Sequence, residues 1–301
     1  MLDLIIIGAG PAGITAAIYA ARKKMNFVII SRDVGGQTAW SGGVENYTGY
    51  QFIPGIELVA KFEEHMKTFA VPLHEGESVQ ELMRQRDMFV VRTDKTEYQA
   101  RTVIVASGKQ SRELGVPGEK EFRNKGLTYC ATCDGPLFAN KDVAVIGGGN
   151  SALDAALQLM RIARRVYLIN IAAELTGDSA IAEKLKNASN VAIYNNARIT
   201  SVNGAQMVAG ITVQKAALVD FLPVQGVFVE IGLIPSAEFI RDVRKNEYGE
   251  IMVNCKSETD VPGLFAAGDV TDVPAKQIIV AAGEGAKAAL SAFHYVAIHS
   301  F

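Results

Sequence analysis

The stretch that decides the fold reads LDLIIIGAGPAGITAAIYAAR and spans residues 2–22. Its aliphatic start, Leu2–Ile7, predicts a buried strand, and its Ala-rich end, Ile14–Arg22, predicts a helix. The glycine motif GAGPAG joins the two, and a second apolar run follows at Asn26–Ile30. Glycines at such a turn let backbone N–H groups and the helix N-terminus approach a pyrophosphate without intervening side chains. The sequence therefore predicts a strand-turn-helix-strand unit that binds a dinucleotide.

The same series occurs a second time. Asp142–Ile146 is an aliphatic run, Ser151–Arg164 is helix-forming, and Arg165–Ile169 is apolar again. The motif GGGNSA at residues 147–152 lies in the turn between the first run and the helix. The sequence therefore predicts two Rossmann-like units and an α/β fold class.

Two strands outside these units indicate how the domains are connected. Thr102–Ala106 is a buried strand between the two units, and GLFAAGD at residues 263–269 predicts another strand, followed by a long Ala-rich helix. A strand and helix so far downstream suggest that the C-terminal part completes the first domain. We therefore expect one domain made of residues 1–112 and 244–301, with a second three-layer domain, residues 113–243, inserted into it.

Length and composition exclude several classes of protein. The chain has 301 residues, of which 49% are hydrophobic and 21% are charged, and its net charge is −2. This composition is typical of a globular protein of two domains and gives no basic field for nucleic acid. The apolar start is too short for a signal peptide or a membrane span. We expect a cytoplasmic protein without nucleic-acid or membrane partners.

The cysteines indicate redox chemistry. Cys130 and Cys133 form a Cys-x-x-Cys motif, in which a disulfide can form and a helix N-terminus lowers the pKa of the first thiol. Asp134 follows directly and can carry protons to and from a departing thiolate. Zinc would need two more ligands, so no metal site is expected; a reduced structural pair with Asp134 as a helix cap stays open. Cys255 lies in an apparent strand, and we expect it to be an inert packing residue.

The residues after each second strand bear on nucleotide choice. After Ile169 the chain reads NIAAE and has no basic residue before Lys184, whereas a 2′-phosphate is usually met by Arg. This absence favours NADH over NADPH, and it leaves open a vestigial nicotinamide site with another electron donor. At the first site the strand ends in Ser31-Arg32, where an acidic residue often holds the ribose.

Taken together, the motifs resemble those of the low-molecular-weight thioredoxin reductases over essentially the whole chain. The segments that carry the resemblance are residues 8–13 (GAGPAG), 35–37 (GGQ), 45–49 (ENYTG), 106–108 (ASG), 130–135 (CATCDG) and 268–269 (GD). Within that group, residues 129–138, 145–151 and 276–287 are similar to the reductase portion of the alkyl hydroperoxide reductase flavoprotein subunit. That subunit carries an additional N-terminal disulfide-relay domain. The sequence begins at the flavin motif, so we expect that a peroxiredoxin is not served through such a relay.

The resemblance implies a flavin-dependent thioredoxin-disulfide reductase that works as a homodimer, with FAD in the first domain. It implies that Cys133 is the thiol nearer the flavin, that Cys130 attacks the partner disulfide, and that Asp134 is the acid-base catalyst. The partner would be thioredoxin or a thioredoxin/glutaredoxin-like protein. Because the cysteine pair and the nicotinamide site share one domain, we expect that domain to rotate on linkers near Gly115–Gly118 and Gly232–Asn246.

The motifs and the resemblance together give two sets of candidate cofactor residues. The candidates for FAD are Gly8, Gly10, Pro11, Ala12, Gly13, Ser31, Arg32, Gly36, Gln37, Asn46, Ala106, Ser107, Gly108, Gly268, Asp269, Lys276, Gln277 and Ile278, with Gln277 close to the isoalloxazine. The candidates for NAD are Gly147, Gly148, Gly149, Asn150, Ser151 and Asn170. At the position of Asn170-Ile171-Ala172, NADPH-linked family members carry a His-Arg-Arg type segment. The NADH-linked relatives usually have Glu in place of Asn170.

Other flavoprotein functions remain as alternatives. A ferredoxin-linked reductase with a vestigial nicotinamide site would keep the cysteine pair. Ferredoxin-NADP reductases and flavin monooxygenases share the fold or the first motif but have no use for a Cys-x-x-Cys. A non-catalytic flavin-binding or redox-sensing module is the remaining option.

Overall fold

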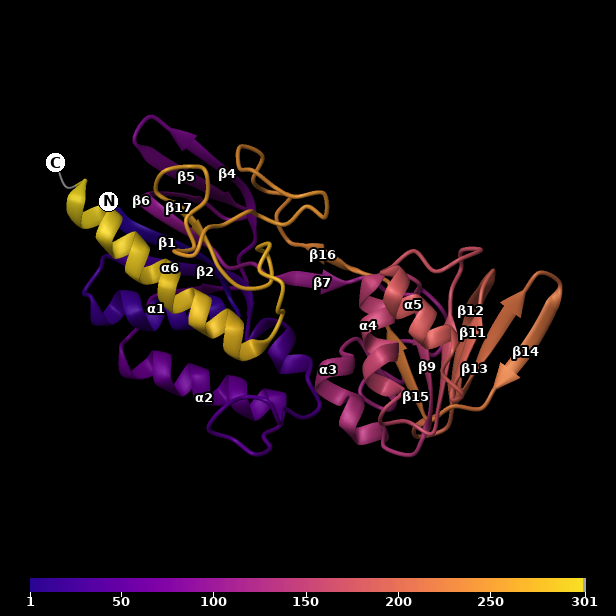
Figure 1. Ribbon diagram of the computed structural model, residues 1–301. Coiled ribbons are helices and arrows are strands. Elements are labelled where there is room, and N and C mark those ends of the chain that lie inside the picture. Colours follow the sequence, from indigo (N-terminus) through magenta and orange to yellow (C-terminus); the bar gives the residue numbers. More distant parts are fainter. Residues whose placement is uncertain (300–301) are drawn as a thin grey trace. The chain divides into compact units, whose positions relative to one another are not determined.

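The computed structural model describes residues 1–299, and the chain divides into two compact units (Figure 1). Unit 1 consists of Met1–Gln110 and Ile234–Phe301, and unit 2 is Ser111–Leu233. The predicted fold class, α/β with one nucleotide-binding domain inserted into another, is confirmed. The last two residues of the expected segment 244–301 lie outside the described residues.

The chain returns from unit 2 to unit 1 after Leu233, earlier than the expected domain boundary between residues 243 and 244. Ala237, Ile240 and Val243 are buried in a core cluster of unit 1, and Ile240 also forms a β-bridge with Leu82. These short bridged segments carry no helical or strand periodicity, so hydrophobic patterning alone did not assign them. Their packing places residues 234–243 in unit 1.

Unit 1 is built on a mainly parallel sheet. Its strands are β1 (Leu2–Ala9), β2 (Phe27–Val34), β3 (Leu73–Glu75), β4 (Val79–Gln85), β5 (Met88–Thr93), β6 (Glu97–Val105) and β17 (Leu264–Ala266). The order is β3-β2-β1-β6-β5-β4, and β17 pairs in parallel with the end of β6. The β4–β5 hairpin instead joins the first half of β6 in antiparallel pairing. The C-terminal strand thus completes the sheet that the N-terminal strand begins.

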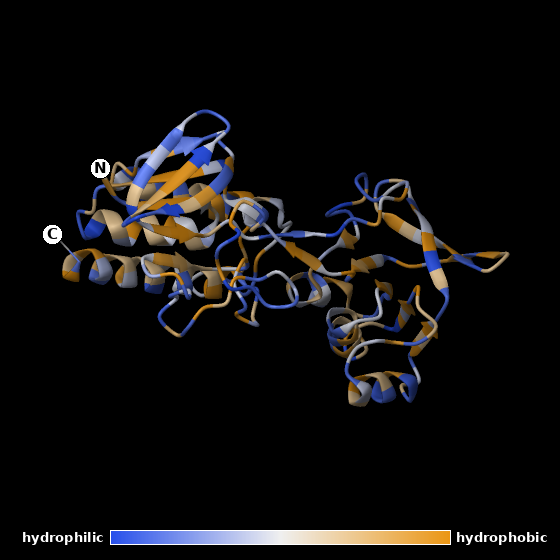
Figure 2. Ribbon diagram, turned by 90° about the horizontal axis from the view of Figure 1, so that it is seen from above, coloured by the Kyte–Doolittle hydropathy of each residue, from blue (hydrophilic) through white to orange (hydrophobic). Residues whose placement is uncertain are grey.

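Alternation along these strands gives the sheet two apolar faces. Leu4 and Ile6 of β1 face a cluster with the alanines of α1 (Pro11–Arg22) and α6 (Ile278–Ile298). Ile5 and Ile7 face the other cluster, which includes residues of β5 and the segment 237–270. Burial on both faces explains why β1 reads as a continuous aliphatic run. Helices α1 and α6 run alongside the strands in Figure 1, and Figure 2 shows apolar residues along those strands.

The remaining helical elements of unit 1 are short or peripheral. They are η1 (Gly36–Trp40) and α2 (Gly55–Thr68). The helix α2 packs against both η1 and α1. Through that contact, the segment after β2 is held beside the first glycine turn.

Unit 2 contains a second parallel sheet and a small antiparallel sheet. The parallel order is β11-β10-β9-β15-β8, and the antiparallel order is β12-β13-β14. The strands are β8 (Leu127–Thr128), β9 (Asp142–Ile146), β10 (Arg165–Ile169), β11 (Val191–Tyr194), β12 (Ala197–Gly204), β13 (Val208–Lys215), β14 (Leu218–Leu222) and β15 (Gly226–Val229). The helical elements are α3 (Ala131–Asp134), η2 (Gly135–Phe138), α4 (Asn150–Leu159) and α5 (Ser179–Lys186).

The two faces of the parallel sheet of unit 2 are covered differently. Val143 and Val145 of β9 pack with apolar residues of α4 and α5. Ala144 and Ile146 face a cluster formed with the inner side of β12 and β13. This arrangement accounts for three layers: helices, parallel sheet and antiparallel sheet.

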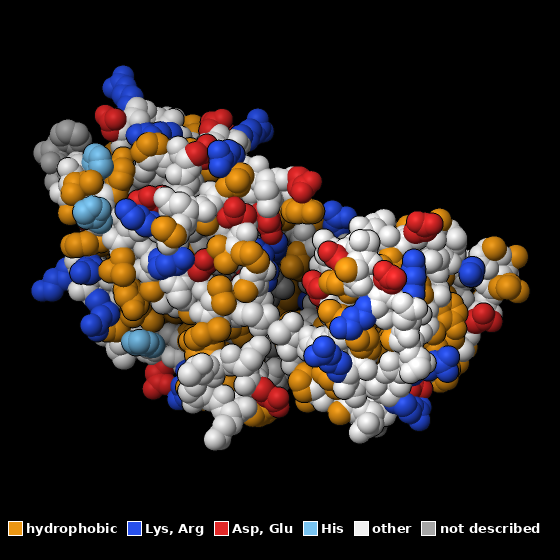
Figure 3. Space-filling model, viewed as in Figure 1, with side chains coloured by type: hydrophobic (Ala, Val, Ile, Leu, Met, Phe, Trp, Pro, Cys, Tyr) orange, Lys and Arg blue, Asp and Glu red, His pale blue; other side chains and the backbone are white. Residues whose placement is uncertain are grey.

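The chain passes between the units in two strands that pair with each other. They are β7 (Lys109–Ser111) and β16 (Leu233–Pro235), which form a two-stranded sheet. On the face shown in Figure 3, acidic and basic side chains are interspersed over both units. Within residues 1–299, no helix has both the length and the apolar character that a membrane crossing requires.

Candidate active site

The first glycine turn has no room for side chains at two positions. Gly8 has a φ of +102°, and a Cβ there would lie 2.4 Å from the carbonyl oxygen of Ala106. A Cβ on Gly13 would lie 1.9 Å from the carbonyl oxygen of Gly8. At Gly10, in contrast, a Cβ would meet nothing within 4 Å. The turn is therefore closed toward the protein and open at Gly10.

Segments far apart in the sequence converge on this open position. A Cβ on Gly36 would lie 3.7 Å from the Cα of Gly10, and a Cβ on Gly268 would lie 3.0 Å from the Cβ of Ala12. Gly10 is the N-cap of α1, and no side chain caps that helix, so its first N–H groups are left for another acceptor. An open glycine cradle at an uncapped helix N-terminus fits the pyrophosphate of FAD. Pro11 at the first helical position is suited to starting this helix.

The residues expected to hold the ribose at this turn behave differently from each other. The Ser31 hydroxyl accepts the N–H of Ala9 at 3.0 Å and donates to the carbonyl oxygen of Asp33 at 2.6 Å. Its single donor is therefore used within the protein, where it ties β2 to the glycine turn. Arg32 is exposed and lies inside β2, which continues to Val34 instead of ending at Ile30.

Several residues predicted to contact FAD make side-chain hydrogen bonds within unit 1, and two of them, Asn46 and Gln277, are bonded to each other. The amide nitrogen of Asn46 donates to Oε1 of Gln277 at 2.9 Å, and Gln37 donates to the carbonyl oxygen of Lys109 at 2.7 Å. Gln277 is the N-cap residue of α6, so the bond from Asn46 fixes the loop 41–54 at the start of that helix. Ser107 donates to the carbonyl oxygen of Ser236 at 2.6 Å.

A buried charge cluster in unit 1 joins Lys276, a predicted FAD contact, to two residues that the motifs did not indicate, Lys109 and Glu250. Glu250 forms ion pairs with Lys109 and with Lys276, the latter at 3.3 Å. Burial alone would raise the pKa of Glu250, but hydrogen bonds from Lys109 and Asn246 and the charge of Lys276 outweigh it and lower that pKa. Burial raises the pKa of Asp269, against the opposing effect of the two lysines, and burial lowers the pKa of Lys276.

The cysteine pair forms a disulfide at the start of the short helix α3 in unit 2. Cys130 and Cys133 are joined with their Cα atoms 5.3 Å apart. Cys130 is the N-cap residue, and its sulfur accepts the N–H of Cys133 at 3.2 Å. Both cysteines are half-buried. A sulfur that accepts a backbone N–H at a helix start can carry negative charge more easily than a free thiol.

Asp134 lies beside the pair with a carboxyl group suited to proton transfer. Its Oδ2 accepts the hydroxyl hydrogen of Thr128. Burial raises the pKa of Asp134, and the hydrogen bond from Thr128 partly opposes this. A carboxyl group with a raised pKa can hold a proton closer to neutral pH than an exposed one.

A second carboxyl group beside the disulfide was not predicted. Oε1 of Glu230 accepts the N–H of Ala131 at 3.3 Å, so this side chain caps α3 from the end of β15. Burial raises the pKa of Glu230 to about 7, with a smaller contribution from Asp154, while the bond from Ala131 acts in the opposite direction. The sequence signal is its position after a buried strand, because the carboxyl ends of parallel strands meet at one edge of a sheet.

The second glycine turn is also closed toward the protein. Gly147 has a φ of +140°, and a Cβ there would lie 2.3 Å from the carbonyl oxygen of Glu230. A Cβ on Gly149 would have nothing nearer than Thr176 Oγ1 at 3.9 Å. The helix α4 starts after Gly149 without a side-chain cap, which fits the pyrophosphate of a nicotinamide dinucleotide. Ser151 lies in the exposed first turn of α4.

The chain itself packs over part of this turn. The carbonyl oxygen of Gly148 accepts the N–H groups of Thr176 at 2.8 Å and of Gly177 at 3.2 Å. Asn150 Oδ1 accepts the N–H of Asp178 at 2.8 Å. The side-chain oxygen of Asn150 therefore holds the loop after β10 in place.

Asn170, expected to contact a ribose, is 3% exposed and bound to its own loop. Its Nδ2 donates to the carbonyl oxygens of Ala172 and Glu174 and to Oδ1 of Asn195, and its Oδ1 accepts the N–H of Ala172. Both amide hydrogens have acceptors in the protein and the oxygen accepts one N–H, so most of the hydrogen-bonding capacity of this side chain is used within the loop. The structure gives Asn170 a role in shaping the loop.

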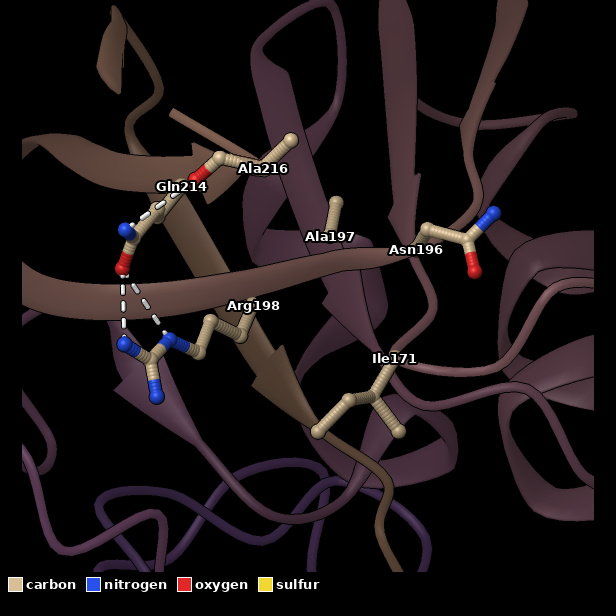
Figure 4. Close-up of a pocket in the computed structure, with 6 residues that line it drawn as sticks. All are labelled: Ile171, Asn196, Ala197, Arg198, Gln214 and Ala216. Atoms are coloured by element: carbon tan, nitrogen blue, oxygen red, sulfur yellow. Dashed lines mark hydrogen bonds between the residues drawn. The ribbon is translucent and has the colours of Figure 1, made fainter. Parts of the chain in front are cut away.

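A pocket of about 250 Å³ lies next to this loop in unit 2 (Figure 4). Its lining residues are Ile171, Asn196, Ala197, Arg198, Gln214 and Ala216. Arg198 donates two hydrogen bonds to Gln214 Oε1, at 3.1 and 2.8 Å, across the β12–β13 pair. The guanidinium group that lines this pocket is thus held by the β12–β13 hairpin.

The third cysteine differs from its predicted role. Cys255 is exposed and lies in a turn, not buried in a strand. Only Ile251 of the expected strand forms bridges, and Asn254 Oδ1 instead accepts the N–H groups of Lys256 and Glu258. Among residues 1–299, no group of three or more His, Cys, Asp or Glu side chains is arranged to hold a metal ion.

Comparison with known proteins gives relatives that agree with this geometry. The chain is 41% identical over 298 residues to the F subunit of alkyl hydroperoxide reductase from Staphylococcus aureus (strain MSSA476), and 41% identical over 298 residues to an NADH dehydrogenase of Bacillus subtilis (strain 168). These matches cover 98% of this chain but only 59% and 58% of the relatives' length. The crystal structure of thioredoxin reductase from Streptococcus pyogenes MGAS5005 matches with a TM-score of 0.94 and 34% identity, over 99% of both chains.

The family model for pyridine nucleotide-disulphide oxidoreductases matches residues 2–285. FAD and NAD(P)H are the cofactors of this family, as the sequence predicted. The resemblance to the thioredoxin reductases is also confirmed, both by the solved structure and by the hydroperoxide reductase relatives. The chain belongs to the pyridine nucleotide-disulphide oxidoreductase family.

Proposed function

We propose that the protein is a FAD-dependent disulfide reductase of the thioredoxin reductase type, with NADH as the favoured donor. The observation that carries this proposal is the Cys130–Cys133 disulfide, which lies at a helix start beside Asp134, a carboxyl group of raised pKa. Bound FAD supplies a two-electron carrier between a nicotinamide and a disulfide. The open turn at Gly10 would hold it, with Gly36 and Gly268 alongside.

The cysteine pair would transfer its electrons by thiol-disulfide exchange. Once reduced, Cys130 as a thiolate attacks a sulfur of the partner's disulfide, forming a mixed disulfide and breaking the partner's S–S bond. The electron pair of that bond leaves with the departing partner sulfur, which takes a proton. Cys133 then attacks Cys130, restores the internal disulfide and releases the partner's second sulfur. Asp134, which follows Cys133 in the chain, would accept the Cys133 proton and return one to the leaving thiolate.

The partner would be thioredoxin or a thioredoxin/glutaredoxin-like protein, because such a protein offers a disulfide between two cysteines of its own. Support comes from the resemblance to a thioredoxin reductase over 99% of both chains. We also propose that the enzyme acts in the cytoplasm as a homodimer. Unit 2 would turn on the paired strands β7 and β16 so that the disulfide and the nicotinamide site can each reach the flavin in turn.

A second candidate donor is supported by the packing over the second glycine turn. Thr176 and Gly177 already donate to Gly148, and Asn170 is committed to its own loop. If these contacts persist, the nicotinamide site is vestigial, and reduced ferredoxin or a similar one-electron carrier would deliver the electrons. The space beside Gly149 and the lack of basic residues from 166 to 183 favour NADH as the first choice.

Anaerobic flavin bleaching tests the donor, and partner reduction tests the output. NADH, NADPH and reduced ferredoxin are added in turn to the holoenzyme, and loss of the oxidised flavin absorbance is recorded. We expect NADH to bleach the flavin faster than NADPH; bleaching by reduced ferredoxin alone would establish the second candidate. Cys133→Ser should still be bleached but should lose partner reduction by at least about 10³-fold, and Cys255→Ser is the matched control.

The same variant can be used to identify the partner protein. Because Cys130 stays reactive while the resolving thiol is gone, Cys133→Ser should trap a mixed disulfide with a thioredoxin-like protein. The adduct is read by mass spectrometry of the linked peptides. Wild-type rates of partner reduction in Cys133→Ser would remove the pair from the mechanism.

A further inference from the structure

We infer that Glu230 is a positioning residue for the redox pair: its carboxylate, held on the first N–H of α3, disfavours the thiolate form of Cys130. This inference rests on the proposed function, since it assigns Glu230 a part in the chemistry of the same disulfide. Neither the glycine motifs nor the Cys-x-x-Cys motif includes this residue. Its position follows from the fold, because β15 lies next to β8 in the parallel sheet and β8 leads into the cysteine motif.

The N-terminal N–H groups of α3 are divided between the Glu230 carboxyl group and the sulfur of Cys130. Ala131 donates to Glu230 Oε1 at 3.3 Å, and Cys133 donates to the sulfur of Cys130 at 3.2 Å. A thiolate at Cys130 would draw on the same positive helix start that already faces the carboxylate. Two negative charges at one helix start repel each other, so a charged Glu230 must make ionisation of the Cys130 thiol less favourable.

Three other acidic or sulfur groups lie on α3 or on α4, the helix that packs against it. Asp154 of α4 is near enough to raise the pKa of Glu230 through its charge. Asp134 lies at the end of α3 and is bonded to Thr128, and Cys133 is the remaining thiol. Burial and the charge of Asp154 raise the pKa of Glu230, and the N–H of Ala131 lowers it. The N–H of Ala131 is thus the contact that favours the charged form of this carboxyl group.

Because the pKa of Glu230 is about 7, its effect should switch on over the working pH range. Below about pH 6 the side chain is protonated and neutral, and it should leave the Cys130 thiol undisturbed. Above about pH 7 it is charged and should hold the thiol protonated to higher pH. A carboxyl group of ordinary pKa would show no such change between pH 6 and 8.

The test measures the thiol directly and needs no donor or partner. Full-length Cys133→Ser/Cys255→Ser protein leaves Cys130 as the reactive thiol, and its alkylation by iodoacetamide is followed by mass spectrometry from pH 5 to 10. Adding Glu230→Gln removes the charge but keeps an oxygen that can accept the Ala131 N–H. We expect alkylation about three- to tenfold faster at pH 8, because one unit of thiol pKa changes the thiolate fraction by up to tenfold, and rates within about twofold at pH 5.5.

Two further variants separate charge from packing. Glu230→Asp keeps the charge and should retain the pH profile of the parent, whereas Glu183→Gln removes an exposed carboxylate of α5 and should change nothing. Equal alkylation of the parent and Glu230→Gln at pH 8 would overturn the inference, as would an equal change in Glu230→Asp and Glu230→Gln. If the proposed reductase function fails, turnover with every donor is absent while this difference in alkylation persists, so the two failures are distinguishable.

Discussion

The two glycine turns come from nearly the same sequence pattern, yet their surroundings differ. In unit 1, Gly10 faces open space, and Gly36 approaches it from a different part of the chain. In unit 2, Gly148 accepts two N–H groups from the loop after β10, and Asn170 packs against it. The motif specifies a backbone shape at both sites. What surrounds that shape is decided by loops that the motif does not include.

This difference separates two roles that a glycine can have. Gly8, Gly13 and Gly147 are required by the fold, because a Cβ at each would overlap a backbone carbonyl oxygen of the protein. Gly10 and Gly149 are not required by the fold, because a Cβ at each would meet no atom closer than ordinary contact. The second pair should therefore matter for ligands only.

The largest effect is expected at the closed positions. Gly13→Ala places a Cβ 1.9 Å from the oxygen of Gly8, and Gly147→Ala places one 2.3 Å from the oxygen of Glu230 at a φ of +140°. Each should cost at least about 3–4 kcal/mol of the free energy of unfolding. Chemical denaturation followed by circular dichroism checks this. Stable, FAD-replete Gly13→Ala protein would contradict the geometry of the turn.

The open positions should separate the two nucleotide sites. Gly10→Ala should weaken FAD binding by about 100-fold, because the methyl group fills the cradle, with little change in stability. Gly149→Ala should leave FAD bound and weaken nicotinamide binding instead. Equilibrium dialysis for FAD and anaerobic bleaching by NADH measure the two effects. Unchanged bleaching in Gly149→Ala would favour the candidate in which the second site is vestigial.

The polar side chains beside the turns should differ in stability contribution. Asn170→Ala removes four hydrogen bonds from a buried loop, and about 3 kcal/mol should be lost. Ser31→Ala removes two, and the loss should be about 1 kcal/mol. Urea denaturation curves compare them. A stability loss below about 1 kcal/mol for Asn170→Ala would mean that its amide does not hold the loop.

Beside the second turn, one group should make stability depend on pH between about 4.5 and 7. The pKa of Glu230 is raised to about 7 from an ordinary value of 4.5, so the folded state binds a proton that the unfolded state releases. The sign follows: stability from this group is present below about pH 4.5 and is lost as pH rises to about 7. We expect a loss of about 1–2 kcal/mol over that interval, allowing for partial exposure.

Glu230→Gln should remove this dependence, since the amide does not titrate. Unfolding curves at pH 5 and pH 7.5 for both proteins measure the difference. The exposed substitution Glu183→Gln serves as the control and should leave the pH dependence as it is. An identical pH dependence in Glu230→Gln and the unsubstituted protein would show that another group is responsible.

Much of the fold could be predicted because its signals are local. A buried parallel strand must be apolar on both faces, so β1 and β9 are visible as continuous runs followed by glycine. The completion of unit 1 by β17 was visible for the same reason. Asn46 and Gln277, which the resemblance assigned to one cofactor, are hydrogen-bonded to each other although 231 positions separate them.

The rest depends on contacts that local patterns do not encode. Asn170 follows a strand as a ribose ligand would, but the path of its loop turns the amide inward. Ile251–Cys255 alternates like a strand, yet the Asn254 side chain stabilises a turn there. Glu230 could have been found by asking which polar residues follow buried parallel strands. That rule places its carboxylate at the same sheet edge as the cysteine pair.

The interrupted course of unit 1 has a consequence for the order in which the protein is made. The contiguous unit 2, residues 111–233, leaves the ribosome with all of its strands, whereas the sheet of unit 1 still lacks β17 and the helix α6. Until residues 264–298 emerge, the second half of β6 lacks its neighbour β17, and α1 lacks the helix α6 that packs against it. Translation that stops between 233 and 264 would therefore release a finished inner unit attached to an unfinished outer one, a substrate for chaperones or proteases.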